Sequence, residues 1–338
     1  MNHYENCMQC PKKCGVNRTQ KQKGFCQETD DLKIAFAGLH FGEEPLVTVF
    51  GGSGTIFITG CTLRCAFCQN YQISQNGYGS NVDSKEFTKM CLDLQNAGAE
   101  NINIVTGSHH IPKLAEFIRA AKDAGVTIPF CWNSSAYETV ESLELLKGLV
   151  TIWLPDLKTL SSSLSKDLFL APDYPQVAAK AIKWMIQNNP LKIKTVESPK
   201  NAKSIEWAQD GKPREKMEQG VIIRHLFLPG KFQETADVLQ WLKENADTKS
   251  CISLMNQYTP VSFNEEKTKL ERRQKALKAI ENRLVSQEED LDIQDLIEAY
   301  DFEYLFYQEL SDDTSWLPDF TKPQPFSNAL ATPIWHCK

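Results

Sequence analysis

Six short runs of β-branched and aromatic residues recur along the chain, and longer segments with helical periodicity separate most of them. The runs cover residues 55–58, 101–107, 127–133, 150–158, 221–230 and 251–258. Each run is largely apolar, as expected for a strand that is buried on both faces of a sheet. The pattern therefore predicts six buried strands.

The segments between these runs predict amphipathic helices. In the first of them, residues 84–98, apolar side chains fall on one helical stripe and Gly98 follows the end. Residues 112–125 repeat this scheme, and three more helices are expected over 137–148, 177–188 and 234–246. Strands that alternate with helices form parallel βαβ units. Six units predict an α/β fold with an open, partial (β/α)6 barrel, and a doubly wound open sheet is the alternative.

Three regions interrupt this regularity. Residues 193–219 are polar and charged and predict an inserted loop or hairpin, whereas residues 264–300 predict a charged helix on the outside. The last part of the chain is rich in proline and aromatic residues and predicts an extended tail. We therefore divide the chain into a cysteine-rich, metal-binding N-terminal segment (1–50), the barrel (51–260) and a helical and extended C-terminal extension (261–338).

Composition and charge narrow the classes of partner. The 338 residues are 41% hydrophobic and carry a formal net charge of -6, so the protein has no global basic field. Binding to nucleic acid or to an anionic membrane surface is not favoured by such a balance. No apolar run has the length of a signal peptide core or of a membrane span. We predict a cytoplasmic protein without membrane or nucleic-acid partners.

The chain contains eleven cysteines, and their distribution is uneven. Seven lie within the first 68 residues, and in a reducing compartment such clustering is better explained by metal than by disulfides. The other four are scattered. Cys91, Cys131 and Cys251 lie in apolar segments, which predicts buried packing residues.

Cys61, Cys65 and Cys68 follow the first predicted strand directly, in a segment that we call the cysteine loop (residues 61–68). Three thiolates on a loop of eight residues can hold three irons of a [4Fe-4S] cluster and leave the fourth iron open to a substrate or cofactor. Zinc is the alternative, but a closed zinc site needs a fourth ligand, which would have to come from a distant residue. The spacing therefore favours an iron-sulfur cluster at the carboxyl edge of the sheet, where parallel folds place their sites.

The arrangement of Cys61, Cys65, Phe67 and Cys68 after a strand resembles the signature of the radical S-adenosylmethionine (radical SAM) superfamily. The resemblance is closer still to proteins that are similar to pyruvate formate-lyase activating enzyme, and it extends over most of the chain. The segments that carry it are residues 6–26, 51–74, 101–110, 132–138, 154–158, 224–230, 253–260 and 333–336.

This resemblance implies a radical SAM oxidoreductase with a partial (β/α)6 barrel and two cofactors, a [4Fe-4S] cluster and S-adenosylmethionine. Reduction of the cluster would cleave S-adenosylmethionine to methionine and a 5′-deoxyadenosyl radical that abstracts a hydrogen atom. An electron donor such as flavodoxin or ferredoxin is implied as a partner. Phe67 is expected beside the cofactor.

Charged residues at the ends of buried strands are further candidates, because such strands have little reason to carry charge unless they line a site. Asp156 and Lys158 are two residues apart and so share a face. Lys158 resembles the lysine that meets the S-adenosylmethionine carboxylate in glycyl-radical activases, and an internal ion pair is the alternative. Arg224 stands in the place of a family arginine that contacts the cofactor. We expect Lys158 and Arg224 to act at the reaction centre, and His225 to pack on the opposite face.

Four uncharged polar residues complete the predicted cofactor site. Thr106 and Ser108 lie where many superfamily members carry a Gly-Gly-Glu stretch that receives the methionine amino group. Their oxygens can accept hydrogen bonds from an ammonium, with less attraction than a carboxylate. Asn133 and Ser134 stand where glycyl-radical activases have Asp and Thr, and we expect them to help position the cofactor.

A second cysteine group, Cys7, Cys10, Cys14 and Cys26, lies on a turn-rich segment that we call the cysteine knuckle (residues 7–26). So short a segment needs help to fold, and four soft ligands predict a closed metal site. Structural zinc and a second iron-sulfur cluster both fit these ligands.

The sequence thus predicts a radical SAM enzyme that abstracts hydrogen from a substrate that it does not identify. Activation of a glycyl-radical enzyme, with a protein glycine as the substrate, is what the nearest family name implies. The rival prediction is a non-catalytic protein that binds iron-sulfur or zinc, or transfers electrons, with both cysteine groups structural.

Overall fold

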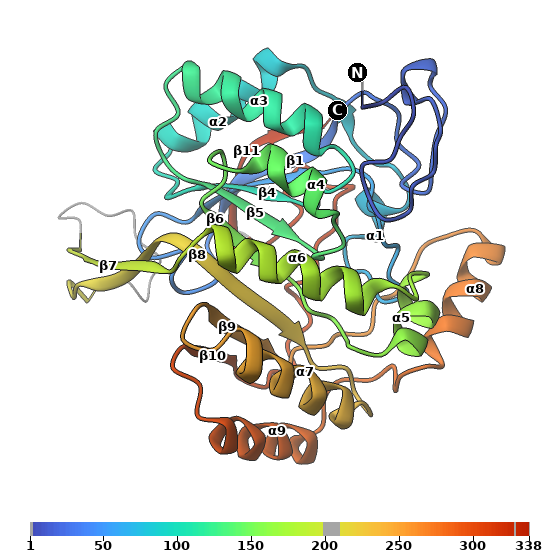
Figure 1. Ribbon diagram of the computed structural model, residues 1–338, viewed down its shortest axis with the longest axis vertical. Helices are drawn as coiled ribbons and strands as arrows, with labels where there is room; N and C mark the ends of the chain where they lie inside the picture. Colours follow the sequence, from blue (N-terminus) through green and yellow to red (C-terminus); the bar gives the residue numbers. More distant parts are fainter. Residues whose placement is uncertain (1–2, 199–209, 328, 338) are drawn as a thin grey trace.

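The computed structural model describes residues 3–198, 210–327 and 329–337 and has an α/β fold (Figure 1). Its strands form one curved sheet in the order β10-β9-β8-β6-β5-β4-β2-β1-β11, with β3 (Ser80–Asn81) and β7 (Lys192–Val196) paired off this path. The carboxyl ends of the parallel strands meet at one edge of this sheet, and the cysteine loop begins at that edge, after β2.

All six predicted strands are confirmed. They are β2 (Ser53–Ile58), β4 (Ile102–Val105), β5 (Phe130–Ser134), β6 (Ile152–Pro155), β8 (Arg214–Leu226) and β9 (Cys251–Met255). Each pairs in parallel with the next one in this order. They form the open, partial barrel that the alternation of strands and helices predicts.

Strands that the pattern did not predict extend this sheet at both edges. Strand β1 (Lys33–His40) pairs antiparallel with β2, and β11 (Ala331–His336) pairs antiparallel with β1. At the other edge, β10 (Leu305–Gln308) is parallel to β9. One sheet therefore contains strands from all three predicted parts of the chain, and the predicted boundaries at residues 50 and 260 stay a prediction.

The predicted helices are present with shifted ends. They are α2 (Ser84–Asn96), α3 (Ile111–Asp123), α6 (Tyr174–Asn188) and α7 (Phe232–Asn245), together with a short α4 (Val140–Leu143) that continues as a 3-10 turn (Glu144–Leu146). Asp83 caps α2 by accepting a hydrogen bond from the Glu86 N–H. Two short helices were not predicted, α1 (Tyr71–Ser74) and α5 (Ser162–Phe169).

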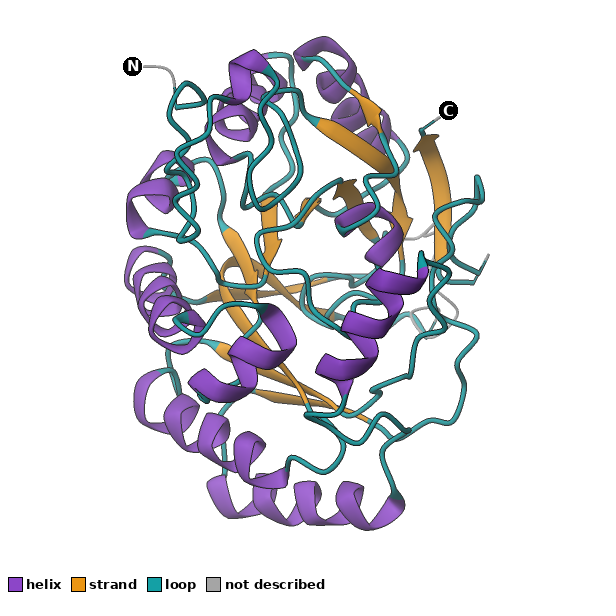
Figure 2. Cartoon of the chain, turned by 90° about the vertical axis from the view of Figure 1, so that its right-hand side faces the viewer, coloured by secondary structure: helices purple, strands orange, loops and turns teal. Residues whose placement is uncertain are grey.

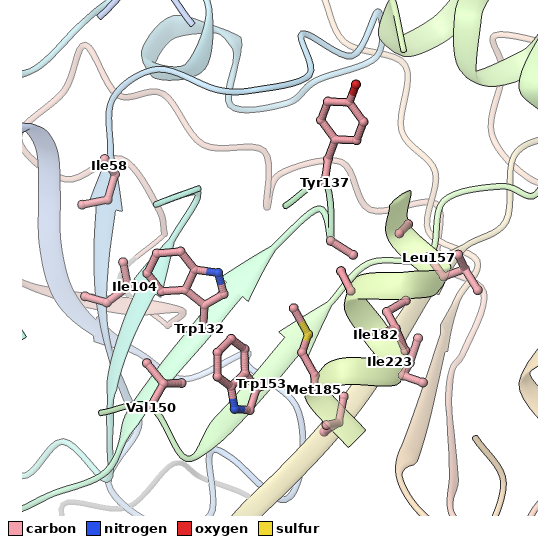
Figure 3. Packing of buried hydrophobic residues seen from close by; sticks show 14 of the residues in the cluster. Ile58, Ile104, Trp132, Tyr137, Val150, Trp153, Leu157, Ile182, Met185 and Ile223 are labelled. Atoms are coloured by element: carbon pink, nitrogen blue, oxygen red, sulfur yellow. The ribbon is translucent and has the colours of Figure 1, made fainter. Parts of the chain in front are cut away.

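The helices pack against one face of the sheet, which we call the helix face. Side chains of α2, α3, α6 and α7 form a single apolar core with alternate residues of the strands. Trp132, Trp153 and Ile223 come from the sheet, and Ile182 and Met185 come from α6 (Figure 3). A doubly wound sheet would carry its βα helices on both faces, so this arrangement excludes that alternative.

The opposite face lines the inside of the partial barrel, and we call it the lumen face. Its lower part is filled by a small cluster that includes Cys131, Leu154, Ile222 and Cys251. Cys91 belongs to the core of the helix face, so all three cysteines predicted as packing residues are buried. Toward the carboxyl ends of the strands the lumen face becomes polar.

The three irregular regions fit their predictions in part. Strand β7 and the first half of β8 form an antiparallel hairpin, which agrees with the hairpin alternative, while residues 199–209 of that insertion lie outside the described residues. The predicted charged helix is two helices, α8 (Lys267–Leu277) and α9 (Gln287–Tyr300). Helix α8 lies beside α5 at the side of the barrel (Figures 1 and 2). The tail ends in β11, so its extended conformation is confirmed there.

Candidate functional site

The cysteine loop leaves β2 through Thr59 and Gly60. Gly60 has φ +92° and a Cβ there would lie 2.7 Å from His109 Nε2, so the tight exit from the strand requires glycine. Cys61, Cys65 and Cys68 are half-buried, and their thiols are free. The loop thus presents three unpaired thiols at the carboxyl edge of the sheet.

Hydrogen bonds hold the cysteine loop in place. The Leu63 N–H donates to Cys61 Sγ at 3.4 Å, and Cys68 Sγ lies 3.3 Å from Ser74 Oγ. The buried guanidinium of Arg273, from α8, donates to the carbonyl oxygens of Cys65 (3.2 Å) and Ala66 (2.9 Å). Helix α8 therefore fixes the backbone between two of the three cysteines.

Burial raises the pKa of the Cys61 thiol to about 12 and also raises that of Cys65. For Cys65, the ammonium of Lys158 opposes this rise, so the lysine lies within electrostatic reach of the cysteine loop. Thiols held in this way lose their protons when they bind metal, which makes metal binding favour high pH.

A network of charged residues faces the cysteine loop from the lumen face. Lys158 Nζ lies 2.7 Å from one carboxylate oxygen of Asp156, and Arg224 Nη2 lies 2.7 Å from the other. Arg224 Nη2 also donates to Asn133 Oδ1 at 2.6 Å. These side chains come from the ends of β5 and β6 and from β8, and the three charged ones are only 14–19% exposed. The structure therefore brings four predicted site residues together.

The network keeps its charges despite burial. Burial alone would raise the pKa of Asp156, but Arg224 and Lys158 outweigh it and hold that pKa below its ordinary value. Burial likewise disfavours the charged form of Arg224, yet Asp156, Glu43 and Glu44 together raise its pKa. At neutral pH the site therefore holds two cations and a carboxylate in fixed positions.

Glu43 is a member of this network that sequence reasoning missed. Its carboxylate lies 3.5 Å from Arg224 Nη1 and accepts hydrogen bonds from Asn103 (2.7 Å) and Asn133 (3.3 Å). It follows β1, in the part of the chain that the sequence assigned to the N-terminal segment. Burial raises the pKa of its neighbour Glu44 to about 7, against the opposing effect of Arg224.

The structure separates Ser134 from Asn133. Neighbouring residues of a strand point to opposite faces, and Ser134 faces the helices, where it bonds to the Ala136 N–H at 3.1 Å. Ser108 lies on the same side of the sheet, where its hydroxyl donates to Glu138 Oε1 at 2.6 Å. Thr106, at the end of β4, is half-buried with φ 64°, in the left-handed region. Ser108 and Ser134 therefore lie apart from the charged network, whereas the Thr106 N–H donates to the Asn133 carbonyl oxygen at 2.9 Å.

Glu138 is the second residue that sequence reasoning missed. It is fully buried, and burial raises its pKa. One carboxylate oxygen, Oε1, accepts from Ser108 and from Trp132 Nε1 (3.2 Å). The other, Oε2, has no hydrogen-bond partner within the part of the chain that the structure describes. A buried carboxylate therefore lies on the loop after β5, bonded to Ser108 and Trp132.

Phe67 lies among aromatic rings beside the cysteine loop, and His225 lies on the helix face. Phe67 packs edge-on against Phe169 and Tyr258, with ring centroids 5.9 Å apart in both pairs, and forms an aromatic wall beside the cysteine loop. His225 Nδ1 lies 2.7 Å from the Leu157 carbonyl oxygen. His225 Nε2 lies 2.9 Å from Thr235 Oγ1 of α7. The prediction that His225 packs on the helix side is confirmed.

The cysteine knuckle lies against the cysteine loop. A Cβ on Gly60 would meet the carbonyl oxygen of Cys26 at 3.3 Å, which leaves no gap between the two segments. The buried Arg18 donates to the His109 carbonyl oxygen at 2.6 Å and to His110 Nε2 at 2.9 Å, and so fastens the knuckle to the loop after β4.

The four knuckle thiols are free and lie near one another. Cys7 and Cys10 are buried, Cys26 is half-buried and Cys14 is exposed. After burial, which dominates, Cys26, Cys7 and Cys14 each add to the raised pKa of Cys10. Across residues 3–198, 210–327 and 329–337, no three side chains of His, Cys, Asp or Glu converge tightly enough to hold one metal ion.

A comparison with known protein families favours an enzyme over a non-catalytic metal-binding protein. Residues 55–193 match the family model described as the radical SAM superfamily, and this span includes the cysteine loop, Asp156 and Lys158. This part of the chain is therefore similar to the radical SAM superfamily. That superfamily implies a [4Fe-4S] cluster and S-adenosylmethionine as cofactors, and radical chemistry that begins with cleavage of S-adenosylmethionine. Three free thiols on one loop, with a buried charged network in front of them, fit such a pair of cofactors.

Several known proteins resemble this chain. The uncharacterized protein MJ0674 of Methanocaldococcus jannaschii is 29% identical over 280 residues, which is 80% of this chain and 71% of that protein. The crystal structure of Streptococcus suis SuiB bound to its precursor peptide SuiA is 12% identical with a TM-score of 0.48. The alignment covers 74% of this chain and 46% of SuiB, so the chain spans less than half of that structure.

Two further solved structures resemble the chain. A radical SAM methyltransferase from Sphaerobacter thermophilus is 13% identical with a TM-score of 0.48, over 78% of this chain and 68% of the methyltransferase. A domain of pyruvate formate-lyase-activating enzyme from Bacteroides vulgatus ATCC 8482 is 10% identical with a TM-score of 0.35, over 59% of this chain and 92% of that domain. Among the residues that the structure describes, no helix has the length and apolarity to cross a membrane.

Proposed function

We propose that Cys61, Cys65 and Cys68 hold three irons of a [4Fe-4S] cluster and that S-adenosylmethionine binds at the fourth. The observation that carries this proposal is the position of Lys158, which Asp156 holds inside the barrel, within electrostatic reach of the free thiol of Cys65. When bound, the reduced cluster supplies the electron that cleaves S-adenosylmethionine to methionine and a 5′-deoxyadenosyl radical. The protein's task is to orient the cofactor and to keep water away from the radical.

The charged network suits the polar end of S-adenosylmethionine. A methionine carboxylate needs a cation, and Lys158 and Arg224 are fixed cations at the carboxyl edge of the sheet. Asp156 holds both cations in place, and Asn133 and Glu43 fix the orientation of the Arg224 guanidinium. Lys158 and Arg224 are therefore the residues that we assign to the reaction centre.

The methionine ammonium needs a negative or strongly polar partner. Thr106 and Ser108 were predicted for this role, and Ser108 is bonded to the buried carboxylate of Glu138. We assign this contact to Thr106, which follows β4 at the carboxyl edge of the sheet, because Ser108 is bonded to Glu138 on the helix side. Phe67 is assigned to the apolar wall of the cofactor site.

The substrate that the sequence resemblance implies is a protein glycine, from which hydrogen is abstracted when a glycyl-radical enzyme is activated. The substrate would enter from the carboxyl edge of the sheet, where Asn133 and Ser134 replace the Asp and Thr of the activases. A protein that only binds metal or transfers electrons is the rival, and it has no need for buried cations beside a cysteine loop.

The cysteine knuckle is proposed to hold a second metal group, either zinc or an iron-sulfur cluster. Its four free thiols, the Phe25 N–H that donates to Cys14 Sγ at 3.3 Å and the contact with Gly60 support this assignment. A metal group there would also complete the fold of a segment with little core of its own.

The first test of the proposed function is a Cys65→Ala variant. We expect anaerobically reconstituted, dithionite-reduced wild-type protein to give a [4Fe-4S] electron paramagnetic resonance signal that changes when S-adenosylmethionine is added. It should also form 5′-deoxyadenosine. In Cys65→Ala both the changed signal and the product should be lost, because the site-differentiated cluster lacks a ligand.

Cys91→Ala is the matched control, since Cys91 is buried in the core of the helix face and should leave both readouts intact. Metal analysis of Cys65→Ala, in which the cysteine knuckle is unchanged, identifies zinc or iron at the second site. A wild-type cluster that ignores S-adenosylmethionine, or a protein that holds only zinc, would contradict the catalytic proposal and support the metal-binding rival.

A further inference from the structure

A groove with basic walls borders the cysteine loop on the side of α8. One wall is the cysteine loop itself, with Arg64 and Ala66, and the other is α8, with Lys269 and Arg272. The backbone between two of the three cysteines therefore forms part of the groove. A molecule seated there would touch the segment that we propose to hold the cluster.

Helix α8 is strongly basic, although the whole chain is acidic. Within residues 267–277 it carries five cations and the single carboxylate of Glu271, whereas the formal net charge of the chain is -6. Two carboxylates also line the groove, but Glu265 is occupied by Arg273 at 2.9 Å, which leaves Asp167 of α5. The groove thus gathers an excess of positive charge beside the cysteine loop.

These cations are not neutralised by the protein. Within the described ranges, the side chains of Arg64, Lys269 and Arg272 form no ion pair or hydrogen bond. Arg64 and Arg272 line the same groove, so their two guanidinium groups lie in one depression. Unpaired positive charges gathered in one groove favour the binding of an anionic partner.

We propose that the groove between the cysteine loop and α8 is the docking surface for an acidic protein that carries one electron. The inference rests on the proposed function, because a cluster in the adjacent loop has to be reduced by an external donor. One electron leaves the donor, which is oxidised, and reduces the cluster held by Cys61, Cys65 and Cys68; no proton or other group is transferred. Complementary charge would raise the rate of encounter and fix the orientation of the donor.

A Lys269→Gln/Arg272→Gln variant tests this proposal. It removes two positive charges but spares Arg273, whose bonds hold the cysteine loop. With limiting reduced flavodoxin, an acidic one-electron donor, we expect 5′-deoxyadenosine formation to fall about tenfold at low ionic strength and the difference from wild type to shrink as salt is added. With dithionite, a small reductant that needs no docking surface, the rate should stay within about twofold of wild type.

The matched control is Lys85→Gln/Lys89→Gln on α2, which removes the same charge elsewhere and should leave both rates unchanged. Equal loss in the two double variants, or equal loss with flavodoxin and dithionite, would overturn the docking surface. Calorimetric titration with oxidised flavodoxin at low salt measures docking without any cluster chemistry. Absence of wild-type binding would also overturn the proposal, whereas binding without any dithionite-driven product would contradict the proposed function instead.

Discussion

The two faces of the central sheet are built from alternate residues of the same strands, yet their composition differs. On β6 and the residues after it, Trp153 and Leu157 join the apolar core under the helices, whereas Asp156 and Lys158 join the charged network. The alternation continues on β8 between Ile223 on the helix face and Arg224 on the lumen face. The helix face is therefore packed for stability, and the lumen face holds the charged network that we propose to bind the cofactor.

This separation has a physical basis. A charged group can stay ionised in a partly buried position only if its partners are fixed, and the packed core holds the strand backbones that carry those partners. Asp156 and Arg224 are directly opposite each other on neighbouring strands, so the register between β6 and β8 sets their distance. The comparison predicts that substitutions on the two faces fail in different ways.

The largest expected effect is on the helix face. Trp153 is fully buried and packs edge-on against Trp184, with ring centroids 5.7 Å apart. Trp153→Ala should lower the free energy of unfolding by about 3–5 kcal/mol, because it removes a large apolar surface and leaves a cavity. Urea denaturation followed by circular dichroism measures this change. Asn133→Ala on the lumen face should cost far less stability, and an equal cost would break the distinction between the faces.

The next effect is on the lumen face. Arg224→Met should lower the rate of 5′-deoxyadenosine formation with dithionite by about 100-fold, because Asp156 and Glu43 lose their shared cation and the cofactor carboxylate loses a partner. The Arg224→Lys variant keeps the charge but loses the forked geometry of the guanidinium. Its rate of 5′-deoxyadenosine formation should therefore lie between those of wild type and Arg224→Met. His225→Gln changes the neighbouring residue on the other face, and a similar loss of rate there would contradict the assignment.

The smallest expected effect concerns pH. Burial lowers the pKa of His225 to about 4, so the folded protein keeps this side chain neutral while the unfolded chain takes up a proton near pH 6.5. The unfolded state binds more protons between these values, so the free energy of unfolding should fall by about 1 kcal/mol between pH 7 and 5.5 from this residue alone. The fall is measured by urea denaturation at each pH. In His225→Gln it should be smaller by that amount, and an unchanged fall would contradict the buried neutral form.

Much of the fold was predictable because its signals are local. Each of the six parallel strands is a short apolar run, and each long helix has a stripe of apolar residues that a window of the sequence reveals. Strand β11 was missed because its partner, β1, lies far earlier in the chain, and no local pattern reports such a pairing. Strand β1 is itself a buried, largely apolar run just before β2, so the local pattern did contain its signal.

The candidate site was predictable where a residue lies at the end of a strand. Side chains alternate between the two faces of a strand, and this alternation correctly predicts that Asp156, Lys158 and Arg224 lie together. It also explains why Asn133 and Ser134 point to opposite faces. Glu43 and Glu138 lie on loops, and their partners are set by tertiary packing: Glu43 is 181 positions before Arg224. Their roles became visible only when the sheet brought these loops to its edge.

The pairing of β11 with β1 has a consequence for how the chain is made. A ribosome adds residues in order, so β1 and β2 are both available roughly 270 residues before β11 emerges to cover the outer edge of β1. During that interval the backbone N–H and C=O groups along this edge are open to pairing with another chain. A nascent or shortened chain that lacks residues 331–336 is therefore expected to be recognised by chaperones or to aggregate, even though its cysteine loop and charged network are already complete.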